Sequence, residues 1–383
     1  MRSPTHSACL SLALLMLAGC DAAEPEQQDA SATATASPQG ADTMASRDPA
    51  SGQAADAGPP DSEPRPVMQA QVVLDRLGFS SGVIDGEANR SFANALTAFQ
   101  QARGLPETGT LDEATAQALA PWSNIPATRV VTIPQEWGKM TFAALPEDAA
   151  AQAKLTQLGY ESMAEKLAER FHTTPEVLAK LNPAPQPTGT PAASPSAAAS
   201  APAPVFAAGQ QIRVPNVGAD AIDPASIDRP VWLETLRSLG IGTNQPEVAR
   251  IVVDESEGWL RAYDAGDRLV AAFTVTTGSE HDPLPIGDWK VKGVAYNPPY
   301  VYNPELFWDV DDSEEKQHLP PGPNGPVGVV WIDLNKDHYG IHGTPEPALI
   351  GHTESHGCVR LANWDAARLA QMVSGRTAVV FRK

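Results

Sequence analysis

The segment 341-IHGTPEPALIGHTESHGCVRL-361 gathers the most reactive side chains of a chain of 383 residues. It contains Cys358 and three of the eight histidines, namely His342, His352 and His356. Cysteine with a nearby histidine is a common composition for a nucleophilic site, because the imidazole can take the thiol proton. We therefore expect the imidazole or a backbone dipole to lower the pKa of Cys358, so that its thiolate forms near neutral pH.

The same four side chains could instead bind zinc through their sulfur and nitrogen atoms. Their spacing lacks the paired short intervals of zinc fingers and the His-x-x-x-His of helical zinc sites. The pattern thus favours a thiol nucleophile, and we expect neither a metal nor another cofactor.

Two motifs in this segment carry a family resemblance. The order His342-Gly343-Thr344, then Ser355-His356-Gly357-Cys358-Val359-Arg360, resembles the signature of the L,D-transpeptidase (YkuD-type) catalytic domain. Further motifs across residues 249–383 fit that family and its Gram-negative branch: Thr277-Gly278, Pro283 to Gly287, Asn297-Pro298-Pro299, Leu319 to Pro323 and Asn363 to Leu369.

The resemblance implies roles for the reactive residues. Cys358 is expected to attack the peptide bond between the L- and D-centres of a peptidoglycan tetrapeptide stem and to release D-alanine. His342 acts as the base, oriented by the carbonyl of Gly343, in the manner of a catalytic triad. The N–H groups of Gly357 and Cys358, with His356, would hold the oxyanion.

The resemblance also implies contacts with substrate. Arg360 meets a stem carboxylate, or else forms a structural ion pair. Ser355 fixes the nucleophile loop, and His352 and Trp308 line the site.

The acyl acceptor decides the product. Transfer to a diaminopimelate amine would make 3-3 cross-links, which is the function that we expect. Transfer to a lysine of an outer-membrane lipoprotein would anchor that protein, and transfer to water would be carboxypeptidase or endopeptidase activity. A non-catalytic wall-binding tether would predict an altered nucleophile or base, yet both residues are present.

Short apolar runs separated by turns predict a mostly-β domain over residues 249–383. These runs are Arg250–Asp254, Trp259–Asp264, Arg268–Thr276, Trp289–Val294, Val327–Asp333 and Ala378–Phe381. Between Asn297 and Pro326 lies a proline-rich segment, which we expect to be a lid or binding loop without regular structure.

Residues 67–121 show three apolar stripes at helical spacing, which predicts an all-α three-helix domain. The order Leu77-Gly78-Phe79, Ile84-Asp85-Gly86, Phe99-Gln100 and Gly104-Leu105 resembles a small peptidoglycan-binding domain. A three-helix bundle without a ligand is the alternative.

Residues 122–217 predict two short helices, Ser162–Phe171 and Thr174–Leu181, and a strand at Gly209–Pro215. This order resembles a degenerate α+β LysM module, which binds N-acetylglucosamine polymers; a module with only a spacing role is the alternative. Residues 183–204 predict a disordered insert, and residues 218–248 a linker with an amphipathic helix at Val231–Leu239.

The N-terminus predicts export. An apolar run from Ala8 to Ala18 is too short to span a bilayer, and Leu17-Ala18-Gly19-Cys20 resembles a bacterial lipobox. Residues 1–19 are thus expected to be a lipoprotein signal peptide, with Cys20 as the lipid anchor and residues 20–66 as a disordered tether. An ordinary secretory signal is the alternative. We expect a periplasmic, membrane-anchored protein, with Asp21 favouring the inner membrane.

The charge limits the partners. The net charge is −19 and the pI is about 4.7. This balance excludes a basic nucleic-acid surface and electrostatic adhesion to anionic membranes.

Overall fold

The computed structural model describes residues 61–183, 205–306 and 315–383. These residues all belong to one compact unit. The predicted signal peptide, Cys20, most of the tether, the insert beyond Pro183, and Trp308 lie outside the described residues. Within the described ranges, no helix is both long and apolar enough to cross a membrane.

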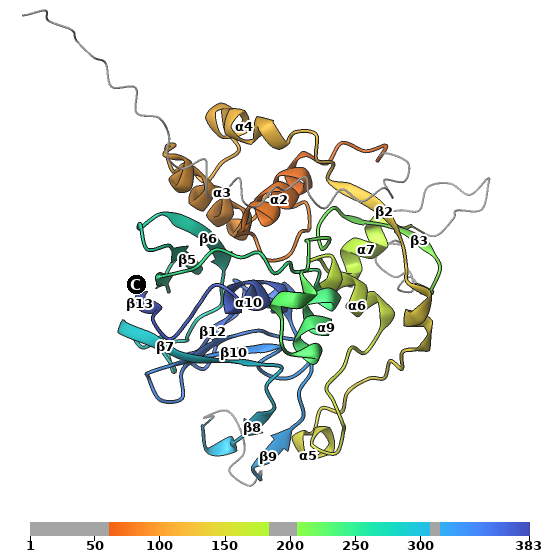
Figure 1. Ribbon diagram of the computed structural model, residues 1–383, viewed down its shortest axis with the longest axis vertical. Coiled ribbons are helices and arrows are strands. Elements are labelled where there is room, and N and C mark those ends of the chain that lie inside the picture. The colour runs from red at the N-terminus through yellow and green to blue at the C-terminus, as the bar shows by residue number, and fades with distance from the viewer. Residues whose placement is uncertain (1–60, 184–204, 307–314) are drawn as a thin grey trace, which may run out of the picture. The chain divides into compact units, whose positions relative to one another are not determined.

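A nine-stranded mixed sheet organises the C-terminal part, in the order β1-β6-β5-β4-β13-β7-β10-β11-β12. Figure 1 shows its strands β5, β6, β7, β10, β12 and β13 around helix α10. Neighbouring strands are antiparallel except for the parallel pairs β1–β6, β4–β13 and β11–β12. Each predicted apolar run overlaps one of the strands, so the mostly-β prediction is confirmed. The strands are β1 (Phe79–Ser80), β4 (Arg250–Asp254), β5 (Trp259–Tyr263), β6 (Leu269–Thr274), β7 (Gly287–Tyr296), β10 (Val330–Leu334), β11 (Gly340–His342), β12 (Val359–Arg360) and β13 (Ala378–Arg382).

Two helices complete the apolar core of this sheet. They are α9 (Pro230–Leu239), which contributes Trp232 and Leu236, and α10 (Asn363–Ala370), which contributes Trp364. All three side chains are at most 3% exposed. Helix α9 was assigned to a linker from the sequence, but its apolar stripe makes it part of the core.

The helical N-terminal segment has the three predicted helices, α2 (Pro66–Leu77), α3 (Arg90–Arg103) and α4 (Glu113–Leu119), followed by η1 (Ala120–Trp122). Gly78 and Gly104 end the first two in the left-handed conformation that glycine adopts without strain. Asp112 caps α4 by accepting from the amide of Thr115. Strand β1 follows α2 and pairs with β6, so this segment extends the edge of the sheet.

The middle segment, residues 123–229, lies between η1 and α9 and has helices between two paired strands. Helices α6 (Met163–Arg170) and α7 (Pro175–Leu181) begin at the predicted caps Ser162 and Thr174. Strand β3 (Gln211–Pro215) pairs antiparallel with β2 (Thr128–Thr132). Strand β2 is the first strand of this segment, and the sequence pattern did not predict it. The segment also contains α5 (Ala149–Gln152), η2 (Gln135–Lys139) and η3 (Pro224–Ser226).

A buried ionic cluster joins the helical segment to the sheet domain. Asp75 of α2 lies 3.4 Å from the guanidinium of Arg368 in α10 and 3.2 Å from Nδ1 of His172. Burial raises the pKa of Asp75, but the charges of Arg368 and His172 outweigh burial and hold that pKa well below its usual range. His172 also stacks on Trp364, with ring centroids 5.2 Å apart.

Two expectations are wrong in detail. The segment from Asn297 to Pro326 contains a hairpin of β8 (Tyr300–Tyr302) and β9 (Gln317–Leu319), with η4 (Pro304–Leu306) between them. The Tyr-Val-Tyr run favours a strand because aromatic and β-branched side chains suit a pleated surface. Residues 61–66, expected to be part of a disordered tether, are ordered: Asp61 accepts hydrogen bonds from Thr128 and Arg65, both at 2.8 Å.

Candidate active site

His342 is the last residue of β11, between β10 and β12. Its ring is 5% exposed and stacks on Trp331 of β10, with centroids 5.4 Å apart. Nδ1 lies 2.7 Å from the carbonyl oxygen of Gly343, so the proton sits on Nδ1 and the lone pair on Nε2. Burial lowers the pKa of His342 to about 4, with a smaller contribution from the charge of Arg360. The imidazole is therefore a neutral base at pH 7.

Cys358 immediately precedes β12, which runs parallel to β11. Ile341 pairs with Val359, so Cys358 is aligned with the start of β11, two residues before His342. Its thiol donates to the carbonyl of His338 at 3.8 Å. Burial raises the pKa of Cys358, and the Gly340 amide and the charge of Arg360 only partly oppose this.

The expectation of a lowered thiol pKa is therefore wrong. Burial of the sulfur outweighs the dipole and charge that favour the thiolate. The thiol of Cys358 and the imidazole of His342 therefore form a neutral resting pair near pH 7.

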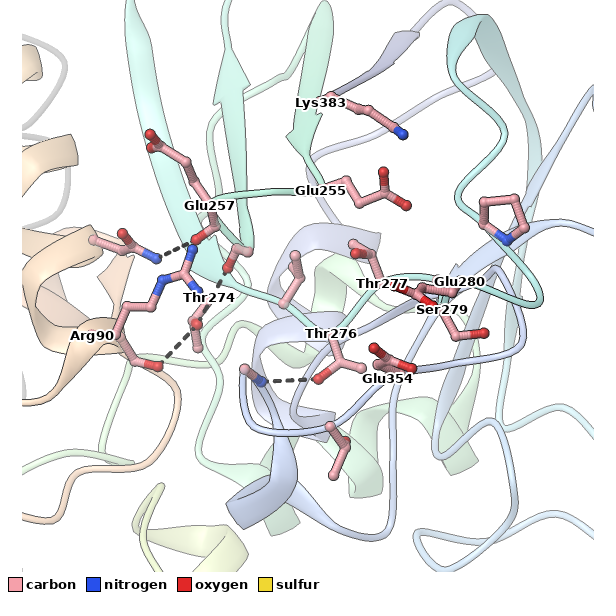
Figure 2. A pocket seen from close by; sticks show the side chains of 18 residues that line it. Arg90, Glu255, Glu257, Thr274, Thr276, Thr277, Ser279, Glu280, Glu354 and Lys383 are labelled. Atoms are coloured by element: carbon pink, nitrogen blue, oxygen red, sulfur yellow. Dashed lines mark hydrogen bonds between the residues drawn. The ribbon is translucent and has the colours of Figure 1, made fainter.

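The residues just after β6 hold both ends of the loop 351–360, which we call the nucleophile loop after the role expected of Cys358. Thr276 exchanges two backbone hydrogen bonds with Arg360, at 3.1 and 2.8 Å, and its hydroxyl accepts from the amide of Gly351 at 2.9 Å. The carbonyl of Thr277 accepts from the amide of Ser355 at 2.8 Å. Figure 2 shows Thr276 and Thr277 between Glu354 and the chain that runs back to Thr274.

Inside the loop, Ser355 and Gly357 fix the backbone around the sulfur. The buried hydroxyl of Ser355 donates to the carbonyl of Cys358 at 2.6 Å, which supports the expectation that Ser355 fixes the loop. Gly357 has φ +91°, and a Cβ there would lie 2.7 Å from the ring of Tyr339. Both the conformation and the space therefore require glycine.

A polar cavity of about 680 Å³ lies on the Thr276 side of the loop. Helix α3 contributes Arg90, the end of β6 contributes Thr274, and the nucleophile loop contributes Glu354 (Figure 2). Threonine hydroxyls and carboxylates line it, and neither Cys358 nor His342 does.

Of two expected binding residues, Arg360 and His352, only Arg360 lies near Cys358 and His342. Arg360 is half-buried, and its charge acts on Cys358, His342 and Tyr300. Within the described ranges, no ion pair joins Arg360 to a carboxylate. His352 is exposed and lines a separate cavity of about 270 Å³, whose other walls include Lys180. That placement does not support the expectation that His352 lines the active site.

Other functional side chains were not found from the sequence. Trp331 covers the base, and Tyr300 and Tyr339 lie near enough to Cys358 for its charge to raise their pKa values, although burial raises them more. Thr276 holds the backbone at Gly351 and Arg360, and Asn363 holds the backbone at Val329. Of these residues, only Asn363 lies in a motif that the sequence resemblance includes; Thr276 directly precedes another, Thr277-Gly278. Among the described residues, no group of three or more His, Cys, Asp or Glu side chains could hold a metal ion.

Family comparisons agree with both domain resemblances. Residues 248–381 match the model described as L,D-transpeptidase catalytic domain (YkuD), and residues 64–119 match the model described as "Putative peptidoglycan binding domain". The YkuD-type resemblance and the peptidoglycan-binding resemblance are thus confirmed for these ranges.

Two curated relatives share the catalytic range. "Putative L,D-transpeptidase YkuD" of Bacillus licheniformis is 32% identical over 130 residues, which cover 34% of this chain and 63% of the relative. "Probable L,D-transpeptidase YbiS" of Escherichia coli (strain K12) is 30% identical over 135 residues, which cover 34% of this chain and 44% of the relative. The chain thus spans less than two thirds of the length of either protein.

A solved structure also matches. It is L,D-transpeptidase 3 from Mycobacterium tuberculosis in complex with a faropenem-derived adduct, with 16% identity and a TM-score of 0.30. The match covers 36% of this chain and 61% of that one.

Proposed function

We propose that this protein is a murein L,D-transpeptidase with Cys358 as nucleophile and His342 as base. The observation that carries the proposal is the neutral imidazole of His342, whose Nδ1–H donates to the carbonyl of Gly343. His342 ends β11, which pairs with β12, the strand that directly follows Cys358. A base in this form has one free acceptor, Nε2, and accepts one proton.

Acylation starts from the neutral pair. Cys358 gives its proton to Nε2 of His342 as the sulfur attacks the carbonyl between the L- and D-centres of a tetrapeptide stem. The N–H groups of Gly357 and Cys358, with His356, hold the oxyanion. The carbon–nitrogen bond then breaks, the imidazolium returns the proton to the leaving amine, D-alanine departs, and a thioester remains on Cys358.

Transfer reverses the proton movements. An acceptor amine attacks the thioester carbonyl while Nε2 of His342 takes its proton, and the Cys358 thiolate leaves and is reprotonated. We propose a diaminopimelate side-chain amine as acceptor, which makes 3-3 cross-links. The match of residues 64–119 to a peptidoglycan-binding model supports an enzyme that stays on the wall. A lipoprotein lysine and water are the alternative acceptors.

Further contacts complete the proposal. Arg360 binds a stem carboxylate, and the action of its charge on both Cys358 and His342 supports a place beside the reacting groups. Trp308, in the segment between β8 and β9, contacts the donor stem. Residues 67–121 bind peptidoglycan, and residues 122–217 form a LysM-like module for its glycan.

We further propose that Cys20 carries a lipid anchor and that the enzyme works in the periplasm of a Gram-negative bacterium. The lipobox-like residues 17–20 support the anchor. The long segment that separates Cys20 from α2 gives the reach from a membrane to the wall that such an enzyme needs.

The test is turnover of a disaccharide-tetrapeptide by the full chain, followed by mass spectrometry of the products. We expect a diaminopimelate–diaminopimelate dimer and free D-alanine from the wild type. Cys358→Ala and His342→Ala should lose turnover, and His281→Ala, an exposed histidine without an assigned role, should keep it. Turnover by Cys358→Ala would refute the nucleophile, and shortened stems without dimers would refute transfer to an amine.

A further inference from the structure

The backbone next to His342 is held by the side chain of Asn363, the first residue of α10. Its Oδ1 accepts from the amide of Val329 at 3.1 Å. The same oxygen packs so closely on Gly328 and Gly343 that a Cβ at either glycine would collide with it. Asn363 therefore fixes the peptide of Gly343, whose carbonyl holds Nδ1 of His342.

The orientation of the Asn363 amide depends on a carboxylate from the middle segment. Nδ2 of Asn363 donates to Oε1 of Glu169 at 2.7 Å and to the carbonyl of Pro323 at 3.0 Å. Glu169, in α6, is 4% exposed, and its other oxygen accepts from the hydroxyl of Tyr160 at 2.9 Å. Glu169 Oε1 and the carbonyl of Pro323 both accept from Nδ2, so the NH₂ side of the amide faces them and Oδ1 faces Val329.

The chain around Glu169 also braces the loop that leads into β10. Asn324 donates through its side chain to Glu165 at 2.6 Å and through its backbone to the carbonyl of Leu158 at 3.0 Å. The amide of Leu158 donates to Pro321 at 3.0 Å. Leu158 and Glu165 thus hold residues 321–324, while Glu169 holds the side chain of Asn363.

We propose that Glu169 is a positioning residue for His342, acting through Asn363 and the peptide of Gly343. The inference rests on the proposed transpeptidase function and adds that the middle segment is part of the catalytic apparatus. Burial of Glu169 is costly, since it raises the pKa of this carboxyl to about 7. An apolar side chain of similar volume would avoid that cost and often stabilises a protein, so fold stability alone does not require the carboxylate.

The test compares Glu169→Met with Glu169→Gln and with Glu165→Met, which removes the neighbouring contact to Asn324 but none to Asn363. Each is made in the full chain and assayed on a soluble disaccharide-tetrapeptide. Methionine keeps the volume without an acceptor, so kcat should fall at least about tenfold with KM within twofold, because misplacing a catalytic group costs up to about 10²-fold. Glutamine can still accept from Asn363 and should restore kcat to within about threefold of the wild type.

A spectroscopic readout separates positioning from stability. In histidine-labelled protein, the Nδ1–H resonance of His342 should shift or broaden in Glu169→Met and stay in place in Glu169→Gln and Glu165→Met. An unchanged resonance, or kcat within twofold in Glu169→Met, would overturn the inference. Because the resonance does not depend on turnover, a wild type without transpeptidase activity would refute the proposed function and leave this inference testable.

Discussion

Replacing Gly357 by alanine tests whether the geometry of the nucleophile loop makes the oxyanion site. Gly357 has φ +91°, and a Cβ there would lie 2.7 Å from Cε1 of Tyr339. The left-handed conformation costs a non-glycine residue about 1–2 kcal/mol, and overpacking costs about 1–3 kcal/mol. Together they disfavour the native loop by about 2–5 kcal/mol, which is below or near the stability of a typical domain. The loop should therefore shift while the sheet stays folded.

A shifted loop moves the amides of Gly357 and Cys358 away from the oxyanion. Each such donor is worth about 10²–10³-fold in rate, so kcat of Gly357→Ala should fall at least about 100-fold. The assay is D-alanine release from a disaccharide-tetrapeptide, with circular dichroism to show that the protein is folded.

Gly104 supplies the matched control. It has φ +65°, and a Cβ there would meet nothing within 4 Å. Gly104→Ala carries the conformational strain without a collision and far along the chain from Cys358, so it should lose about 1–2 kcal/mol of stability and keep its activity. If Gly357→Ala were folded and within threefold of the wild type in kcat, the loop geometry would not be what holds the oxyanion.

Four further outcomes are expected. Alkylation of Cys358 by iodoacetamide should keep accelerating above the pH at which an ordinary thiol ionises, because burial raises the pKa of this thiol; a plateau near pH 7 would contradict the neutral resting pair. The acid limb of kcat/KM should lie near pH 4 rather than 6.5, because protonation of His342 removes the base and its pKa is about 4. Since the unfolded chain protonates His342 first, stability should fall as pH drops from 6.5 toward 4, and His342→Gln should flatten that slope in urea titrations; an unchanged slope would argue against a buried neutral ring. Asp75→Ala leaves the buried Arg368 with only the more distant carboxylate of Asp220, at 3.8 Å, and should lower the free energy of unfolding by about 3–5 kcal/mol, measured by denaturant titration; a loss under 1 kcal/mol would mean that the cluster is not coupled to folding.

Local sequence signals predicted the elements that depend on local chemistry. Ser162 and Thr174 cap α6 and α7 as expected, because their hydroxyls accept from amides three residues later. Gly78 and Gly104 end α2 and α3 for another local reason, because glycine adopts the left-handed conformation without strain. The motif around Cys358 was equally visible, since its residues are nearly contiguous.

Contacts between distant segments were not predictable from those signals. The two-residue strand β1 is too short to show a period, and it forms only because β6 offers an edge. Glu169 stands on an amphipathic helix like any charged residue, and its partner Asn363 lies 194 positions away. The raised pKa of Cys358 likewise comes from burial, which cannot be read from the residues next to it in the sequence.

The most direct test is intact-mass spectrometry of the protein mixed with a disaccharide-tetrapeptide whose diaminopimelate side-chain amine is acetylated, so that it cannot act as acceptor, followed by peptide mapping. A covalent adduct of the disaccharide-tripeptide acyl group should appear on the peptide that contains Cys358, with one D-alanine released for each adduct. An adduct of the same mass on Cys358→Ala protein, or D-alanine release without any adduct even under rapid quenching, would contradict a thioester on this sulfur.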